Sequence, residues 1–191
     1  MNQKEDFTTR VSNLPTGSNT VNPFIMTDQA ADLIDFLIKV FGALEVPEAR
    51  TLDSDGLILH SELRIGDSMI TVADRKPDWP FTPAFNRVYV NNVDATLARA
   101  VECGAQIVTK PTDFFGDVLA RFTDPHGNLW WVYKHAQSST DWQSPSGENS
   151  WAVDDEDASW ESFSTPELEH IHTTLIQAMT SLRDPREFTG S

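Results

Sequence analysis

The feature that most constrains the fold is an internal repeat between residues 21 and 135. Phe41-Gly42-Ala43 is matched by Cys103-Gly104-Ala105 at an offset of 104 − 42 = 62 residues, and the glycines Gly66 and Gly127 are 127 − 66 = 61 residues apart. Each half has too few strands to cover its own helix and close a core. We therefore predict an α+β fold of two β-α-β-β-β modules, about 21–75 and 85–135, forming a curved mixed sheet around a cleft.

Apolar periodicity and turn residues predict the same order of elements in both modules. The first module should contain a strand at 21–26, a helix at 28–41, an extended stretch at 44–52 and a hairpin of 57–65 with 68–73. The second should contain a strand at 87–91, a helix at 94–102, a short strand at 106–109 and a hairpin of 118–123 with 129–133. Residues 75–84 hold three prolines and are expected to connect the two modules.

The ends of the chain differ in composition from this repeat. Residues 1–20 are polar and are expected to be a flexible N-terminal segment, and residues 136–165 form an acidic linker rich in Trp and Ser. Residues 166–183 are expected to form an amphipathic helix, with Thr165 as its N-cap and Pro166 in its first turn. Its apolar stripe is Leu168, Ile171, Leu175, Met179 and Leu182. We predict that this tail folds back on the modules or crosses to a second subunit; the alternative is a disordered tail.

Charge and composition exclude some classes of function. With 29 acidic and 14 basic residues the net charge is −15, which repels phosphate backbones, so we expect no nucleic-acid partner. No apolar run approaches the roughly 20 residues that a membrane helix needs, and no secretory signal is found, so no membrane association is expected. The lone Cys103 cannot form an internal disulfide, which favours a cytoplasmic location.

Several motifs resemble one known family. They are Asn22-Pro23-Phe24-Ile25, Val40-Phe41-Gly42-Ala43, the run from His60 to Ser68, Val93-Asp94-Ala95, and Asp124-Pro125-His126-Gly127-Asn128-Leu129-Trp130. Together they resemble the PhnB-like branch of the vicinal oxygen chelate superfamily, which includes glyoxalases, bleomycin resistance proteins and dioxygenases. The resemblance covers about residues 21–135. It implies the two-module fold, a small-molecule ligand and a homodimer, but this fold carries several chemistries.

The resemblance also implies that the sheet face away from the helices lines the ligand cleft. Strand alternation then selects the side chains on that face. The candidate ligand-binding residues are His60, Glu62, Arg64, Ile70, Arg121, Trp131 and Tyr133. A structural alternative is that Glu62 pairs with Arg64 or Arg121 across strands, beside His60, and that Trp131 only fills the cleft.

Metal-dependent relatives imply four ligand positions, which fall here on Asn22, Ile70, Val88 and Trp131. Three of these side chains have no donor suited to a hard divalent ion, so we expect neither a metal nor another cofactor. The sequence therefore favours a metal-free protein that sequesters or carries a small, partly apolar ligand. The alternative is a lyase, isomerase or dioxygenase-type enzyme, with a displaced metal site or with acid–base chemistry at His60 and Glu62.

Overall fold

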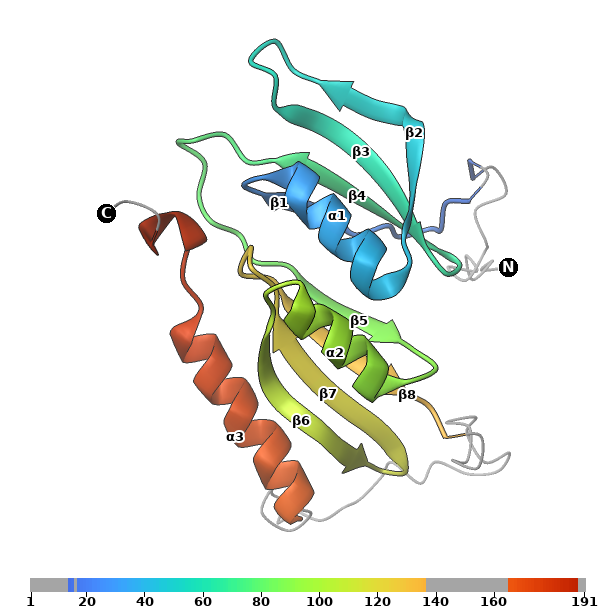
Figure 1. Ribbon diagram of the computed structural model, residues 1–191, viewed down its shortest axis with the longest axis vertical. Coiled ribbons are helices and arrows are strands. Elements are labelled where there is room, and N and C mark those ends of the chain that lie inside the picture. Colours follow the sequence, from blue (N-terminus) through green and yellow to red (C-terminus); the bar gives the residue numbers. More distant parts are fainter. Residues whose placement is uncertain (1–13, 16, 137–164, 189–191) are drawn as a thin grey trace, which may run out of the picture. The chain divides into compact units, whose positions relative to one another are not determined.

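The computed structural model describes residues 14–15, 17–136 and 165–188, and the chain divides into two compact units, Met1–Ala84 and Phe85–Ser191 (Figure 1). The predicted α+β class is confirmed, because each unit holds a four-stranded mixed sheet with a helix, and a C-terminal helix follows. Most of the predicted N-terminal segment 1–20 and nearly all of the predicted linker 136–165 lie outside the described residues.

The first unit has the predicted β-α-β-β-β order. Its elements are β1 (Phe24–Thr27), α1 (Ala30–Phe41), β2 (Leu44–Leu52), β3 (Ile58–Ile65) and β4 (Ser68–Asp74). The strands lie in the order β1-β4-β3-β2, and only the β1–β4 pair is parallel. The helix α1 buries one apolar stripe against this sheet, and the fully buried core there includes Leu33, Leu37, Leu63 and Val72.

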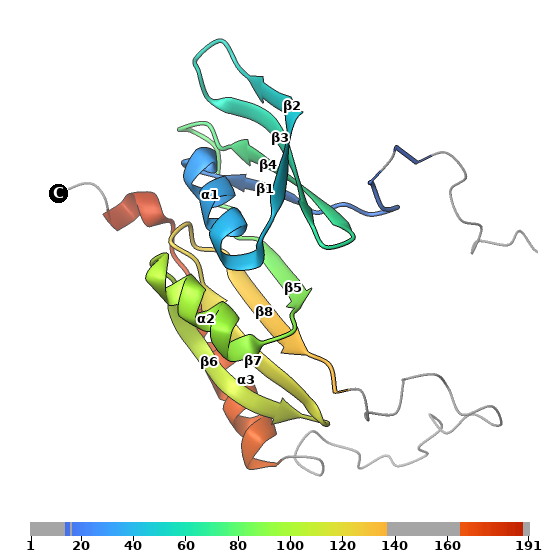
Figure 2. The ribbon, with the colours of Figure 1, turned by 45° about the vertical axis from the view of Figure 1, so that its right-hand side comes forward.

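The second unit repeats the pattern and adds a C-terminal helix (Figure 2). Its elements are β5 (Phe85–Tyr89), α2 (Val93–Glu102), β6 (Gln106–Phe114), β7 (Asp117–Thr123), β8 (Leu129–Lys134), α3 (Pro166–Ser181) and a short 3-10 turn, η2 (Pro185–Phe188). The strand order is β5-β8-β7-β6, again with one parallel pair, β5–β8. Phe122 and Trp130 stack beside each other, and both are fully buried.

The repeated glycines end the two helices. Gly42 has φ = 68° and donates its N–H to the carbonyl of Ile38. This left-handed backbone conformation is costly for a residue that has a Cβ atom, so glycine is favoured at this position. Gly104 has φ = 91°, lies one residue beyond Cys103, the C-cap of α2, and donates its N–H to the carbonyl of Val101. At the start of α1 no local side chain caps the helix, and Asp74 from β4 instead accepts the N–H of Ala30 at 2.8 Å.

The strands β2 and β6, each at an edge of its sheet, are irregular. Pro47 lies in β2 and Pro111 lies in β6, and the strand pairing shifts register near each proline. The prediction that the second of these strands ends at residue 109 is wrong, since β6 continues to Phe114. An edge strand has one side without ladder hydrogen bonds, so a residue that cannot donate an N–H is tolerated there.

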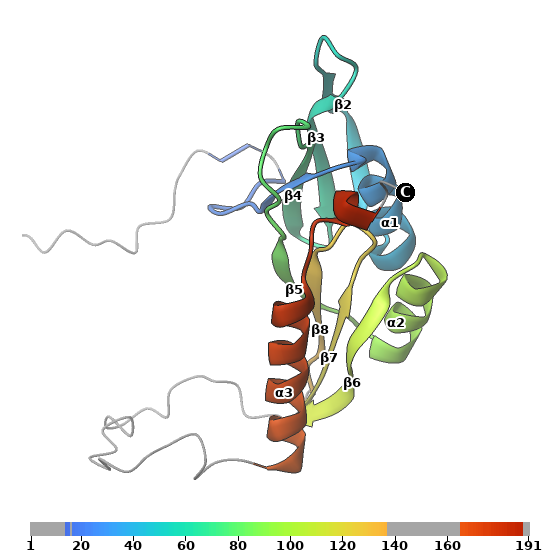
Figure 3. The same cartoon turned by 90° about the vertical axis from the view of Figure 1, so that its left-hand side faces the viewer.

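The helix α3 lies on the face of the second sheet opposite α2 (Figure 3). Its buried residues are Leu168, Ile171 and Ala178, while Met179 of the predicted stripe is 47% exposed. Thr174 of α3 and Thr109 of β6 share a hydrogen bond of 2.8 Å. Thus α3 packs on its own unit, and no helix in the described part of the chain is long and apolar enough to cross a membrane.

Candidate functional site

We call the sheet face away from a unit's own β-α-β helix its outer face. Residues directly opposite each other on paired strands point to the same side of a sheet, so the pairing assigns every side chain to a face. In the second unit Ala120 pairs with Val132, and Phe122 pairs with Trp130, and all four are fully buried on the α2 side. Their neighbours Arg121 and Trp131, which pair with each other, therefore belong to the outer face.

A row of cationic and aromatic side chains crosses this outer face. Arg87 of β5 pairs with Trp131 of β8, which pairs with Arg121 of β7. The guanidinium carbon of Arg121 is 5.2 Å from the centre of the Trp131 ring, and the Phe85 ring meets the same indole edge to face at 6.1 Å. These distances are in the range of cation–π and aromatic contacts, so the indole is held between the two.

The next row on the same face contains Tyr89, Tyr133 and Leu119, again in register. Arg87 lies over both tyrosine rings, at 5.4 Å from the centre of the Tyr89 ring and 5.6 Å from that of Tyr133. Tyr89 is 56% exposed, whereas Tyr133 is buried. Burial raises the pKa of the Tyr133 phenol, and the nearby guanidinium of Arg121 opposes that rise. The phenol is thus neutral at physiological pH.

Arg121 is the most unusual charge on this face. Its residue is only 4% exposed, and it has no carboxylate partner among the described residues. Its Nη1 donates to Thr109 Oγ1 at 3.2 Å and to the main-chain oxygen of Ile171 in α3 at 2.7 Å, while Nε has no hydrogen-bond partner. Burial lowers the pKa of this guanidinium. Burying a cation removes its hydration, and without an anionic partner the remaining hydrogen bonds offset only part of that cost in free energy.

The outer face of the first unit brings together the predicted residues His60 and Glu62. Nε2 of His60 lies 3.2 Å from Oε1 of Glu62, and both side chains are partly exposed. The exposed Phe24 ring meets the His60 ring at 6.4 Å. Arg64 is exposed on the same face and pairs across the sheet with Met69. Glu62 therefore pairs with His60 rather than with an arginine.

The prediction that Ile70 lies on the cleft side is wrong. Ile70 pairs with Leu63, and both are buried on the α1 side. The first hairpin turn holds two residues, 66–67, and the second holds five, 124–128. The two turns differ by 5 − 2 = 3 residues, which is an odd number. Residues at the same distance from the hairpin glycine therefore face opposite sides of the sheet in β4 and β8. The repeat offset therefore matches β3 with β7 but does not match β4 with β8.

The implied metal positions do not all lie on the outer face. Val88 pairs with Val132 on the α2 side, and the amide of Asn22 exchanges hydrogen bonds with the backbone of Asn19. The neighbouring outer-face pairs on the parallel strands are Phe24 with Thr71 and Arg87 with Trp131. Across residues 14–15, 17–136 and 165–188, no three His, Cys, Asp or Glu side chains come together in a way that could hold a metal ion.

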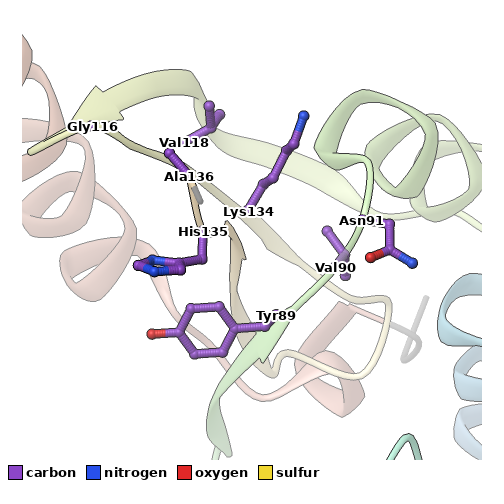
Figure 4. Close-up of a pocket in the computed structure, with 8 residues that line it drawn as sticks. All are labelled: Tyr89, Val90, Asn91, Gly116, Val118, Lys134, His135 and Ala136. Carbon is purple, nitrogen blue, oxygen red and sulfur yellow. The ribbon is translucent and has the colours of Figure 1, made fainter. Parts of the chain in front are cut away.

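A pocket of about 580 Å³ adjoins Tyr89 at one end of the second sheet (Figure 4). Nδ1 of His135 lies 2.8 Å from Oδ1 of Asp117 at this pocket. Its lining residues are Tyr89, Val90, Asn91, Gly116, Val118, Lys134, His135 and Ala136. None of them was among the predicted site residues, although His135, directly after β8, continues the alternation of Trp131 and Tyr133.

Asp124 positions the strand that carries Trp131. Its buried carboxylate accepts hydrogen bonds from the backbone N–H groups of His126 and Asn128, from the Asn128 amide and from the Trp130 indole, all between 2.8 and 2.9 Å. Burial raises the pKa of this carboxyl, and the bonds from Trp130 and Asn128 oppose the rise. His126 is therefore part of a turn, and the turn fixes which side of β8 faces outward.

The sequence analysis missed Phe85, Arg87 and Tyr89, which complete the outer face of the second unit. All three lie at alternate positions of β5, and Phe85 is 48% exposed. The alternation of aromatic and basic residues was present in the sequence. Phe85 was missed because the strand was expected to start at 87. Arg87 and Tyr89 were missed because the implied metal position placed their neighbour Val88 on the cleft side, whereas the pairing with β8 turns Val88 to the other face.

Comparison with known proteins gives a consistent result. Residues 19–132 match the model of the family described as the Glyoxalase/Bleomycin resistance protein/Dioxygenase superfamily. The Mycobacterium tuberculosis (H37Rv) protein Rv0887c is 32% identical over 122 residues, which cover 58% of this chain and 71% of that protein. The Mycobacterium bovis protein Mb0911c has the same identity, and 79% of its length is covered.

Solved structures share the fold at lower identity. A glyoxalase/bleomycin resistance protein/dioxygenase family enzyme from Burkholderia phytofirmans PsJN is 18% identical with a TM-score of 0.50, covering 58% of this chain and 94% of that one. Protein PA1353 from Pseudomonas aeruginosa is 16% identical with a TM-score of 0.50, covering 60% and 96%. At these identities the likeness concerns the fold alone.

Proposed function

This chain belongs to the glyoxalase/bleomycin resistance protein/dioxygenase superfamily, and we propose that within it the chain binds a small, partly apolar organic molecule, which it sequesters or carries. The observation that carries this proposal is the row of Arg87, Trp131 and Arg121 on the outer face of the second unit. The motifs quoted above favour the PhnB-like branch of the superfamily.

The chemistry of this row suits a planar ligand. Small organic ligands are usually held by aromatic and apolar walls with a few polar groups that fix orientation. Here Trp131 and the tyrosines Tyr89 and Tyr133 offer ring faces, and two guanidinium groups lie within 5.2 to 5.6 Å of those rings. A ligand with a flat apolar part and a polar or anionic end would use both kinds of contact.

We further propose that binding uses no metal. The reason lies in the side chains at the outer-face positions of the parallel strands, Phe24, Thr71, Arg87 and Trp131. One hydroxyl cannot hold a divalent ion alone, and a nearby arginine repels it. Elemental analysis of the purified full-length chain should give far less than one divalent ion per chain, and about one would contradict the metal-free proposal.

Binding can be tested with a panel of small aromatic compounds followed by ligand-observed NMR on the full-length chain. Trp131→Ala should weaken binding of every compound that binds, by about fivefold or more, because stacking on an aromatic face is worth about 1 kcal/mol or more. Trp79→Ala is the matched control, since Trp79 is a 41% exposed tryptophan of the connecting segment. Equal losses in the two variants would place the ligand elsewhere.

A second candidate function, acid–base catalysis, rests on the pair of His60 and Glu62 at 3.2 Å. A carboxylate beside an imidazole orients the ring and can assist proton transfer. The same two side chains could supply part of a displaced metal site. Stoichiometric metal in the purified chain that is lost in His60→Ala would favour the enzyme over the binding protein. Turnover of a bound compound, lost in Glu62→Gln with binding retained, would do the same without metal.

A further inference from the structure

The helix α3 lies on the face to which we assign the ligand. Ile171 of α3 is buried against Leu119 and Tyr133 of the outer face, with Trp131 and Phe114 packed around this cluster. The main-chain oxygen of Ile171 accepts a hydrogen bond of 2.7 Å from Nη1 of Arg121. A segment of the chain itself therefore occupies the half of the outer face that contains the buried guanidinium.

This arrangement leaves Arg121 incompletely satisfied. A peptide oxygen carries only a partial charge, and Nε of Arg121 remains without a partner while the residue is 4% exposed. A carboxylate matches a guanidinium with two parallel hydrogen bonds and a full negative charge. The indole of Trp131, 5.2 Å below the same guanidinium, offers a flat surface beside it. Both features fit an aromatic acid better than they fit a helix carbonyl.

We propose that α3 is a displaceable cover over an anion site, and that the ligand is a small aromatic carboxylate. Its carboxylate would replace the Ile171 oxygen at Arg121, and its ring would lie against Trp131. This inference rests on the proposed function, and it names both the chemical class of the ligand and a control of access to it.

The contacts of α3 are consistent with release. The helix has 16 residues, of which only Leu168, Ile171 and Ala178 are buried, and a helix of that length is marginally stable in water without such contacts. Residues 137–164 join it to the sheet, so an undocked helix stays attached to the chain. Since ligand and helix exclude each other, the apparent affinity is the intrinsic affinity multiplied by the fraction of molecules in which α3 is undocked. Docking of α3 therefore weakens binding.

The test uses benzoate as the probe and benzamide as its neutral counterpart, titrated by NMR into the full-length chain. Ile171→Gln places a polar amide in the buried contact without adding charge. Ile176→Gln is the matched control, because Ile176 lies on the same helix and is 49% exposed. Hydrogen exchange of α3 reports its release. We expect Ile171→Gln to bind benzoate at least tenfold more tightly than wild type, and Ile176→Gln to bind as wild type does.

Arg121→Met in the Ile171→Gln background should abolish the gain for benzoate and leave benzamide unchanged. Arg99→Met, on the exposed side of α2, should leave the gain intact. Equal benzoate affinity in wild type and in a variant whose α3 exchanges freely would overturn the cover but not the proposed function. No binding of benzoate with α3 released would overturn the aromatic carboxylate as ligand, whereas the proposed function is decided by the compound panel. The inference also fails if the amides of α3 remain protected from hydrogen exchange both in Ile171→Gln and in the double variant Ile171→Gln with Ala178→Gln, because α3 is then not displaceable.

Discussion

At the scale of single residues, a few buried polar groups determine where the outer face lies. The Asp124 carboxylate accepts hydrogen bonds from backbone and side-chain groups of its own turn. It also accepts one from the indole of Trp130, the residue before Trp131. Because adjacent residues on a strand face opposite ways, fixing Trp130 inward fixes Trp131 outward. Asp74 has a comparable role in the first unit, where its carboxylate joins the start of α1 to the N–H of Ile58 at the start of β3.

Asp124→Asn should destabilise the protein by about 2–4 kcal/mol, because the new amide group faces donors that then lose their acceptor. Chemical denaturation followed by tryptophan fluorescence measures this change in the free energy of unfolding. Asp78→Asn is the control, since Asp78 is exposed on the connecting segment. A change of less than about 0.5 kcal/mol in Asp124→Asn would show that the network does not stabilise the fold.

The ion pair of Glu45 and Arg50 predicts a dependence of stability on pH. Nε of Arg50 lies 2.7 Å from Oε1 of Glu45, and this bond lowers the pKa of the Glu45 carboxyl below its ordinary value of 4.5. A lowered pKa means that the pair stabilises the fold above pH 4.5 and that this contribution is lost as the pH falls through the folded-state pKa. Arg50→Met should cost at most about 1 kcal/mol at pH 7 and less at pH 3. An equal loss at both pH values would contradict this.

At the scale of elements, the local sequence predicted which helices and strands form, and their order, better than it predicted where each one ends. Periodicity located α1, α2 and α3 because a helix with one apolar stripe repeats its pattern over several turns. It did not locate the second half of β6, because Pro111 interrupts the apolar pattern there. Pairing with β7 nevertheless extends the strand to Phe114, since a proline is tolerated in an edge strand. The sequence also did not predict the surface on which α3 packs. An apolar stripe shows that a helix needs a packing partner, but it does not identify that partner.

Leu168→Ala should weaken the docking of α3 by about 2 kcal/mol, since Leu168 is 5% exposed at the helix start. Faster hydrogen exchange confined to α3 is the expected readout, with strands β7 and β8 unchanged. Ile176→Ala removes a similar number of atoms from the exposed side and should leave the exchange of α3 as in wild type. If both variants speed exchange equally, docking does not depend on the Leu168 contact.

At the scale of the whole molecule, the internal repeat was sufficient to predict the fold class and the number of modules. Two helix-ending glycines and two hairpins at nearly constant spacing leave few other arrangements of an α+β chain. For the candidate site, strand alternation assigned His60 and Glu62, and Arg121 and Trp131, to the cleft face, and the structure brings each pair into contact. It misplaced Ile70 because the phase of a returning strand depends on turn length, which a glycine spacing does not reveal.

We also expect the chain to form a homodimer, as the family resemblance implies. Leu52 of the edge strand β2 and Leu59 of β3 are 59% and 51% exposed, and exposed apolar side chains favour a contact with another chain. Light scattering should give about twice the chain mass of 21.4 kDa, and Leu52→Lys with Leu59→Lys should return it to one chain. A single-chain mass for the wild type at all concentrations would contradict the dimer.

The opposite phase of β4 and β8 affects how the two halves can be exchanged in protein engineering. A chimera that copies the second half onto the first by the 61-residue spacing would place the indole of Trp131 in the core of the first unit, at Ile70, and Val132 on its outer face, at Thr71. Residues of a binding face must instead be transplanted from Trp131 to Thr71 or Met69, one step away on the strand, because these share the outward direction. Any attempt to build a symmetric two-site binder from this scaffold should therefore follow strand pairing and not sequence alignment.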